Sequence, residues 1–182
     1  SSSSSSSVKS LSPDIAYPNE YLKSDVTEEE VLPTPDMSIS YKIPSMMYHH
    51  INPDSVNDPK DSVLRGISMS PAKFEADLKD IRDKGYETVF PYEISDKLKR
   101  NIKQDKKYVL LTIDDGYEDI YKYAFPLLKK YNMKATYYIM PNFVGRRDDP
   151  NKKGTPGDYT TWDELKEMSD SGLINIGSHT MD

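Results

Sequence analysis

The stretch that decides the fold runs from residue 108 to residue 117 and reads YVLLTIDDGY. Its uncharged, mostly apolar first part predicts a buried strand over Tyr108 to Ile113, and two adjacent carboxylates, Asp114 and Asp115, stand at the carboxyl end of that strand. Two neighbouring negative charges repel, so one is driven towards protonation unless a cation or strong hydrogen bonds keep both ionised. A bound metal ion is the simplest way to hold such a pair.

Strand patterns and helix patterns alternate on both sides of this stretch. Phe74, Leu78 and Ile81 recur at helical spacing after Ser70, which suits the N-cap position. Pro126 stands inside another helical pattern, where it predicts a kink or a delayed start because proline lacks an N–H donor. The expected strands are 43–48, 87–90, 108–113, 135–140 and 173–176, and the expected helices are 70–84, 93–101, 118–131 and 161–171. This alternation predicts an α/β fold with a parallel sheet, either open or closed into a barrel.

Polar residues follow three of the expected strands: His49 and His50, Asp114 and Asp115, and His179. In both architectures active sites collect at the carboxyl ends of the strands, so we expect these residues to converge. Each has a simpler explanation as well, because Asp-Asp-Gly suits an ordinary turn and a histidine can serve as a hydrogen-bonded strand end. Of two successive strand residues one usually faces the core. A functional histidine among the pair would be the one that points into the cleft, where it could protonate a leaving amine.

Composition restricts the possible chemistry. The chain has 182 residues and no cysteine, so a metal would be held by Asp, Glu or His. The net charge of -6 with scattered basic residues makes nucleic acid an unsuitable partner. No apolar run reaches the ~20 residues that cross a bilayer, and we expect a soluble chain without a signal peptide at its start. Residues 1–40 are expected to form a low-complexity linker, and 41–182 one folded domain.

The sequence resembles the polysaccharide deacetylase family, whose catalytic module is the NodB homology domain of carbohydrate esterase family 4. Residues 112–116 match the family motif Thr-Phe-Asp-Asp-Gly, and residues 179–182 supply all but the last position of His-Ser/Thr-x-x-His. Residues 124–131 and 134–138 resemble the helix and strand between these motifs. Residues 47–51, Met-Tyr-His-His-Ile, are similar to the branch that deacetylates poly-N-acetylglucosamine in biofilms.

The resemblance implies a distorted parallel (β/α) barrel of the NodB type, of which this chain holds only a part. It implies that Asp114 is the general base that deprotonates a metal-bound water. Asp115 and His179 are implied as two of three ligands to a divalent metal, most simply Zn²⁺. His49 is implied as the general acid, with His50 as the alternative. The third ligand would fall immediately after Asp182, so we expect a fragment with weak metal binding and little activity by itself.

The function that the resemblance implies is metal-dependent hydrolysis of N-acetyl groups from an N-acetylglucosamine polysaccharide, outside the cell or in the cell envelope. One alternative is an esterase that removes O-acetyl groups, since the same site can attack either carbonyl. Another is a catalytically silent carbohydrate-binding module, against which the presence of both Asp114 and Asp115 argues. A partial barrel would expose a sheet edge, so self-association is also expected.

Overall fold

The structure is a computed structural model that describes residues 31–57, 61–147 and 157–180. The chain divides into two units, residues 1–32 and 33–182, and every described helix and strand lies in the second. The first 30 positions of the expected linker lie outside the described residues. Residues 31–44, which are described, contain no helix or strand.

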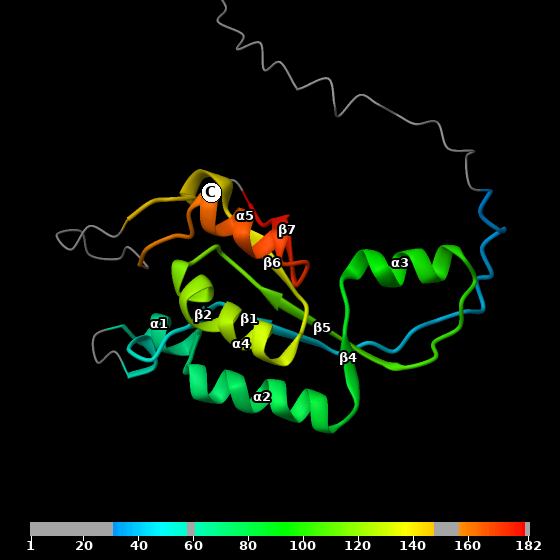
Figure 1. Cartoon of the computed structure of the whole chain (residues 1–182), viewed down its shortest axis with the longest axis horizontal. Coiled ribbons are helices and arrows are strands. Elements are labelled where there is room, and N and C mark those ends of the chain that lie inside the picture. The colour runs from blue at the N-terminus through cyan, green and yellow to red at the C-terminus, as the bar shows by residue number, and fades with distance from the viewer. Residues whose placement is uncertain (1–30, 58–60, 148–156, 181–182) are drawn as a thin grey trace, which may run out of the picture. The chain divides into compact units, whose positions relative to one another are not determined.

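Five parallel strands form the main sheet of the second unit (Figure 1). They are β1 (Ser45–Tyr48), β4 (Tyr86–Thr88), β5 (Lys107–Ile113), β6 (Ala135–Ile139) and β7 (Ile174–Ser178). The order is β1-β5-β6-β7, and β4 pairs with the first residues of β5. The parallel α/β fold expected from the sequence is confirmed. Within the described residues the path of strands stays open, with β1 and β7 at its two ends.

Four of the helices correspond to those that the sequence patterns predict. They are α2 (Pro71–Asp83), α3 (Pro91–Lys99), α4 (Phe125–Tyr131) and α5 (Trp162–Asp170). A short α1 (Ser62–Gly66) and 3-10 turns at Ser55–Asn57 and Pro141–Phe143 were not predicted. Ser70 caps α2 by accepting a hydrogen bond from the Lys73 N–H at 3.2 Å. Thr161 and Glu164 form the capping box that begins α5. None of the described helices is long and apolar enough to span a membrane.

Pro126 has the effect expected of it. The π-helix η3 (Ile120–Ala124) precedes α4, so the predicted helix over 118–131 changes its winding just before the proline. A proline cannot donate to the carbonyl of the preceding turn, but it fits the first turn of a new α-helical segment, where its N–H would have no partner. The α-helical part therefore begins at Phe125.

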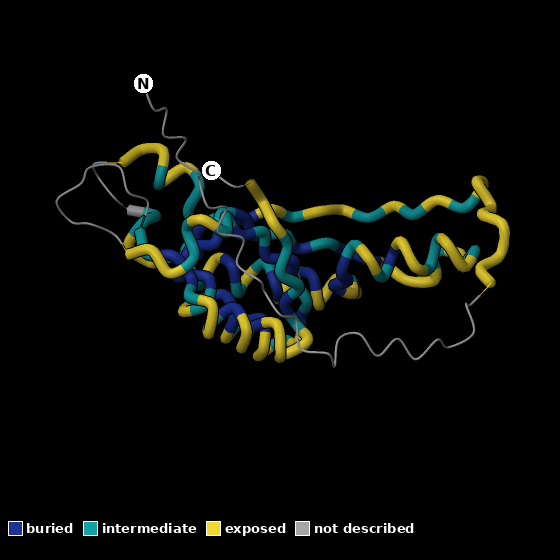
Figure 2. The backbone as a smooth tube through the Cα atoms, turned by 90° about the horizontal axis from the view of Figure 1, so that it is seen from above, coloured by how far each residue is buried: buried dark blue, intermediate teal, exposed yellow. Residues whose placement is uncertain are grey.

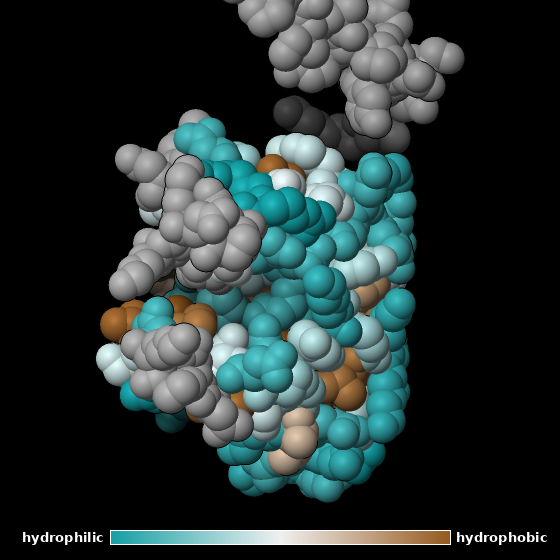
Figure 3. Space-filling model, turned by 90° about the vertical axis from the view of Figure 1, so that its left-hand side faces the viewer, coloured by the Kyte–Doolittle hydropathy of each residue, from teal (hydrophilic) through white to brown (hydrophobic). Residues whose placement is uncertain are grey.

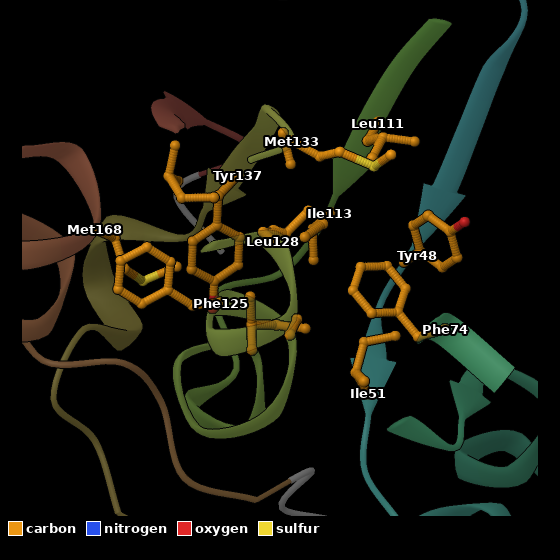
Figure 4. Close-up of a cluster of buried hydrophobic side chains, with 14 of the residues drawn as sticks. Tyr48, Ile51, Phe74, Leu111, Ile113, Phe125, Leu128, Met133, Tyr137 and Met168 are labelled. Carbon is orange, nitrogen blue, oxygen red and sulfur yellow. The ribbon is translucent and has the colours of Figure 1, made fainter. Parts of the chain in front are cut away.

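The core lies between the sheet and the layer formed by α2, η3, α4 and α5 (Figures 1 and 4). Side chains of a strand alternate between its two faces. Tyr48, Ile113 and Tyr137 are partners in register and face the helices, where each is almost fully buried. Burial of one such large side chain stabilises the fold by ~1.5–3 kcal/mol. Figure 2 shows the buried residues, in dark blue, gathered together and flanked by intermediate and exposed ones.

The opposite face of the sheet positions the site. Met47 and Thr112, again partners in register, lie on this face, and the Met47 side chain is exposed. His49 and Asp114 follow them by two positions, so alternation places both on the same face. The Asp114 N–H donates to the Tyr48 carbonyl at 2.9 Å, which shows that the pairing of the two segments continues beyond the strands themselves.

The sequence also did not predict a second sheet. Residues 52–59 have a loop composition, yet β2 (His50–Ile51) and β3 (Ser68–Met69) on either side of that region form a second, two-stranded parallel sheet. The segment that carries both histidines is thereby held at two places. Tyr48 packs in the main core, and the N–H of His50 donates to the carbonyl of Ile67 at 3.2 Å.

Candidate active site

The turn that follows β5 presents the two carboxylates. Asp115 and Gly116 adopt the left-handed backbone region, with φ of 76° and 91°. The carbonyl of Gly116 accepts from the N–H of Thr160 at 3.0 Å, and the carbonyl of Tyr117 accepts from the hydroxyl of Tyr137 at 2.6 Å. Glycine is favoured at position 116, because its positive φ strains residues that have a side chain and a Cβ there would lie 3.4 Å from Ile139. The turn is therefore fixed by the backbone and by side chains of the core.

Asp114, Asp115 and His179 meet at the carboxyl ends of β5 and β7. The Nε2 atom of His179 lies 3.9 Å from Oδ2 of Asp114 and 4.0 Å from Oδ1 of Asp115. The N–H of His179 donates to the carbonyl of Ile139 at 2.8 Å, so the β6–β7 ladder extends into the site. Asp114 is buried, Asp115 is partly buried, and the His179 side chain is 36% exposed. The expected convergence of these three residues is present.

The surroundings of Asp114 favour its neutral form. Burial raises the pKa of the Asp114 carboxyl above its ordinary value, and the nearby charge of Asp115 raises it further. His49 and His179 act in the opposite direction and lower the pKa. A carboxylate whose proton affinity is increased in this way is suited to accept a proton from a reacting group.

The structure separates the two successive histidines. His50 is 3% exposed, its Nδ1 lies 2.7 Å from Oδ2 of Asp119, and its ring stacks on Tyr117 at 3.7 Å between centroids. His49 is only partly buried and lies on the same side as Asp114, whose pKa it lowers. Both histidines line a cavity of about 200 Å³, together with Met47, Ile67 and Met69. Of the two, His49 is the more exposed to solvent.

Asp115 and His179 carry ligand atoms of the types that bind a divalent cation. A carboxylate oxygen and an imidazole nitrogen are normal zinc ligands, and their separation of 4.0 Å lies within the ~4.2 Å that two bonds of about 2.1 Å can span. Among the described residues no three His, Asp or Glu side chains come together as a metal-binding group. The described part of the site therefore offers two ligands with Asp114 beside them.

A match to a protein family covers the part of the chain that contains these residues. Residues 101–182 match the family model described as Polysaccharide deacetylase. The part of the chain that carries the two carboxylates and His179 therefore belongs to the polysaccharide deacetylase family.

Individual family members extend the likeness towards the amino terminus. The YxkH protein of Bacillus subtilis (strain 168), whose name is that of a polysaccharide deacetylase, is 38% identical over 78% of this chain and 43% of its own length. The poly-beta-1,6-N-acetyl-D-glucosamine N-deacetylase of Staphylococcus aureus (strain MSSA476) is 32% identical over 65% of this chain and 39% of its own length. The chain thus spans about two-fifths of the length of these relatives.

A solved deacetylase has a similar fold over part of its length. The Streptococcus pyogenes deacetylase PplD, determined in complex with acetate, matches with a TM-score of 0.62 and 30% identity. The match covers 82% of this chain and 58% of that one. The fold is therefore that of the NodB-type deacetylases, here as an open arrangement of parallel strands.

Sequence patterns did not predict which residues support the turn that presents Asp114 and Asp115. Tyr117 and Asp119 contact His50, and Asp119 is 69 positions away from it along the chain. No spacing rule connects residues so far apart. One relevant signal was available in the sequence. Strand alternation predicted that one of His49 and His50 faces the core, but it did not show which one.

Proposed function

We propose that the protein hydrolyses N-acetyl groups of an N-acetylglucosamine polysaccharide, with Asp114 as general base and His49 as general acid. One observation carries the proposal. At the carboxyl ends of β5 and β7, Nε2 of His179 lies 3.9 Å from Oδ2 of Asp114 and 4.0 Å from Oδ1 of Asp115. Membership of the family and the names of the relatives support the same reaction class. The resemblance to deacetylases of biofilm polymers leads us to propose also that the protein works outside the cell or in its envelope.

The proposed reaction follows from what each residue can do. Asp115 and His179 would hold a divalent cation, which supplies a Lewis acid to polarise the acetamide carbonyl and favour ionisation of water. The oxygen of the attacking water forms a bond to the carbonyl carbon, and Asp114 accepts the proton that this water loses. The carbon–nitrogen bond then breaks, and His49 donates a proton to the departing nitrogen. The products are acetate and a free amine on the sugar.

The test is the release of acetate and of free amines from a poly-N-acetylglucosamine substrate by the full-length gene product with added Zn²⁺. We expect both products in equal amounts, and we expect Asp114→Asn to abolish them while the variant stays folded. Acetate without amines would show an O-acetyl esterase instead. No acetate at all, with retained binding of the polymer, would show a silent carbohydrate-binding module.

A further inference from the structure

His50 and Asp119 form a buried polar pair behind the candidate active site. The imidazole N–H at Nδ1 donates to Oδ2 of the Asp119 carboxylate at 2.7 Å, and the two side chains are 4% and 8% exposed. The imidazole also stacks on Tyr117 with an angle of 20° between the ring planes. One side chain of β2 thus contacts two side chains that follow the carboxylate turn.

These contacts join the two segments that carry the proposed catalytic groups. His50 comes directly after His49, and Tyr117 and Asp119 come directly after the turn that presents Asp114 and Asp115. Tyr117 is itself held at its carbonyl by the hydroxyls of Tyr137 and Thr160, at 2.6 and 3.1 Å. A shift of the His50 ring would therefore change the position of the acid relative to the base.

The contribution of the His50–Asp119 pair to the stability of the fold does not explain why it is there. Nε2 of His50 and Oδ1 of Asp119 are both buried and have no hydrogen-bond partner among the described residues. Burial of polar atoms without partners is unfavourable, and apolar residues of similar volume often replace a buried ion pair without loss of stability. A directional bond does provide what apolar packing does not, which is a fixed distance and orientation between two segments.

We propose that His50 is a positioning residue for the deacetylation reaction: its bond to Asp119 and its stacking on Tyr117 set the geometry between His49 and the Asp114–Asp115 turn. The proposal rests on the proposed function, because it concerns the same site. His50 touches neither the substrate nor a cation in this role. It acts through the segments that it connects.

Two substitutions of His50 distinguish the effect of its hydrogen bond to Asp119 from the effect of its side-chain volume. His50→Asn keeps an N–H donor close to the position of Nδ1 and is the matched control. His50→Leu fills similar space without a donor. In the full-length gene product we expect His50→Leu to lower kcat by about 10- to 100-fold, the range found when residues that orient a site are replaced. KM should stay within about twofold, and His50→Asn should restore most of kcat.

Hydrogen exchange on the 182-residue chain gives a readout that needs no activity. The N–H of Asp114 is bonded to Tyr48, and we expect it to exchange about tenfold faster in His50→Leu but not in His50→Asn. Amides in the middle of α2, such as that of Leu78, should keep their rates. Asp119→Leu should reproduce the effect, and the double variant should be no worse than either single one.

Specific results would overturn the proposal. Unchanged kcat and unchanged exchange at Asp114 in His50→Leu would show that the pair positions nothing. Faster exchange throughout α2 as well would show a general structural role. If the unsubstituted gene product releases no acetate, the proposed function fails, and the exchange rates of the turn alone decide whether His50 positions it.

Discussion

Gly177 lies under the ring of Tyr138, and an alanine in its place would test how closely β6 and β7 pack beside the site. The two residues are partners in register. A Cβ atom at position 177 would lie 2.7 Å from Cδ1 and 2.8 Å from Cε1 of Tyr138. Carbon atoms in favourable contact are ~3.5–4.0 Å apart, so the ring or the strand must move.

The loss of stability follows from how closely a Cβ at position 177 would approach the Tyr138 ring. Overpacking of a well-packed region typically costs ~1–3 kcal/mol, and we expect Gly177→Ala to lower the free energy of unfolding by that amount. For a domain of this size each kcal/mol lowers Tm by about 2–4 °C. The displacement should also reach His179, because it follows Gly177 by two positions and continues the same ladder through its bond to Ile139.

Urea unfolding of the 182-residue chain, followed by circular dichroism, measures the change. Gly66→Ala is the control, because a Cβ there meets nothing within 4 Å and should change the unfolding free energy by less than ~0.5 kcal/mol. Removal of the ring should relieve the clash. In a Tyr138→Ala background we therefore expect Gly177→Ala to cost less than about 0.5 kcal/mol.

Two outcomes would refute this reasoning. Equal stability of Gly177→Ala and the unsubstituted protein would mean that the ring moves aside freely. An equal cost of Gly177→Ala with and without the Tyr138 ring would place the cause in the glycine backbone rather than in the contact.

Three further predictions concern the site and the helix that precedes β7. In the metal-free chain Asp114 should titrate above the usual ~3.9 of an aspartate by carboxyl-carbon NMR, and Asp115→Asn should lower that pKa by removing a neighbouring charge. Because the folded pKa is raised, the associated stability is present below the unfolded pKa of ~3.9 and is lost as pH rises through the raised value; stability that is lost instead as pH falls through this range would contradict the sign. Asp115→Ala and His179→Ala should each weaken Zn²⁺ binding at least about tenfold by calorimetry, whereas the surface variant Asp83→Ala should not. Thr161→Ala should lower the unfolding free energy by ~1 kcal/mol through loss of the α5 capping box, and Thr161→Ser should retain most of it.

Local patterns predicted most of the fold. Phe74, Leu78 and Ile81 were expected on the buried face of one helix, and all three are buried in α2. The run before Asp114 was expected as a buried strand, and it is the central strand β5. These signals are strong because each depends on neighbours within about two turns or a few strand positions.

Features that depend on distant partners were not predictable in the same way. Strands β2 and β3 have two residues each, so neither shows a period, and their pairing joins positions 50 and 68. The separation of His49 from His50 depends on Asp119, 69 residues from His50, and on the stacked ring of Tyr117. The motif located the carboxylates, whereas contacts with Asp119 and Tyr117 bury His50 and leave His49 only partly buried.

The most direct test of the account is the deacetylase assay with Asp114→Asn in the full-length gene product. Acetate and free amines should appear together with the unsubstituted protein and should fall by at least ~100-fold in the variant, since general-base catalysis contributes ~10²–10⁴-fold. Zn²⁺ content and thermal unfolding should show that the variant keeps its metal and its fold. Full deacetylation by folded, metal-loaded Asp114→Asn would contradict the central claim that this carboxylate, at the end of β5, accepts the proton of the attacking water.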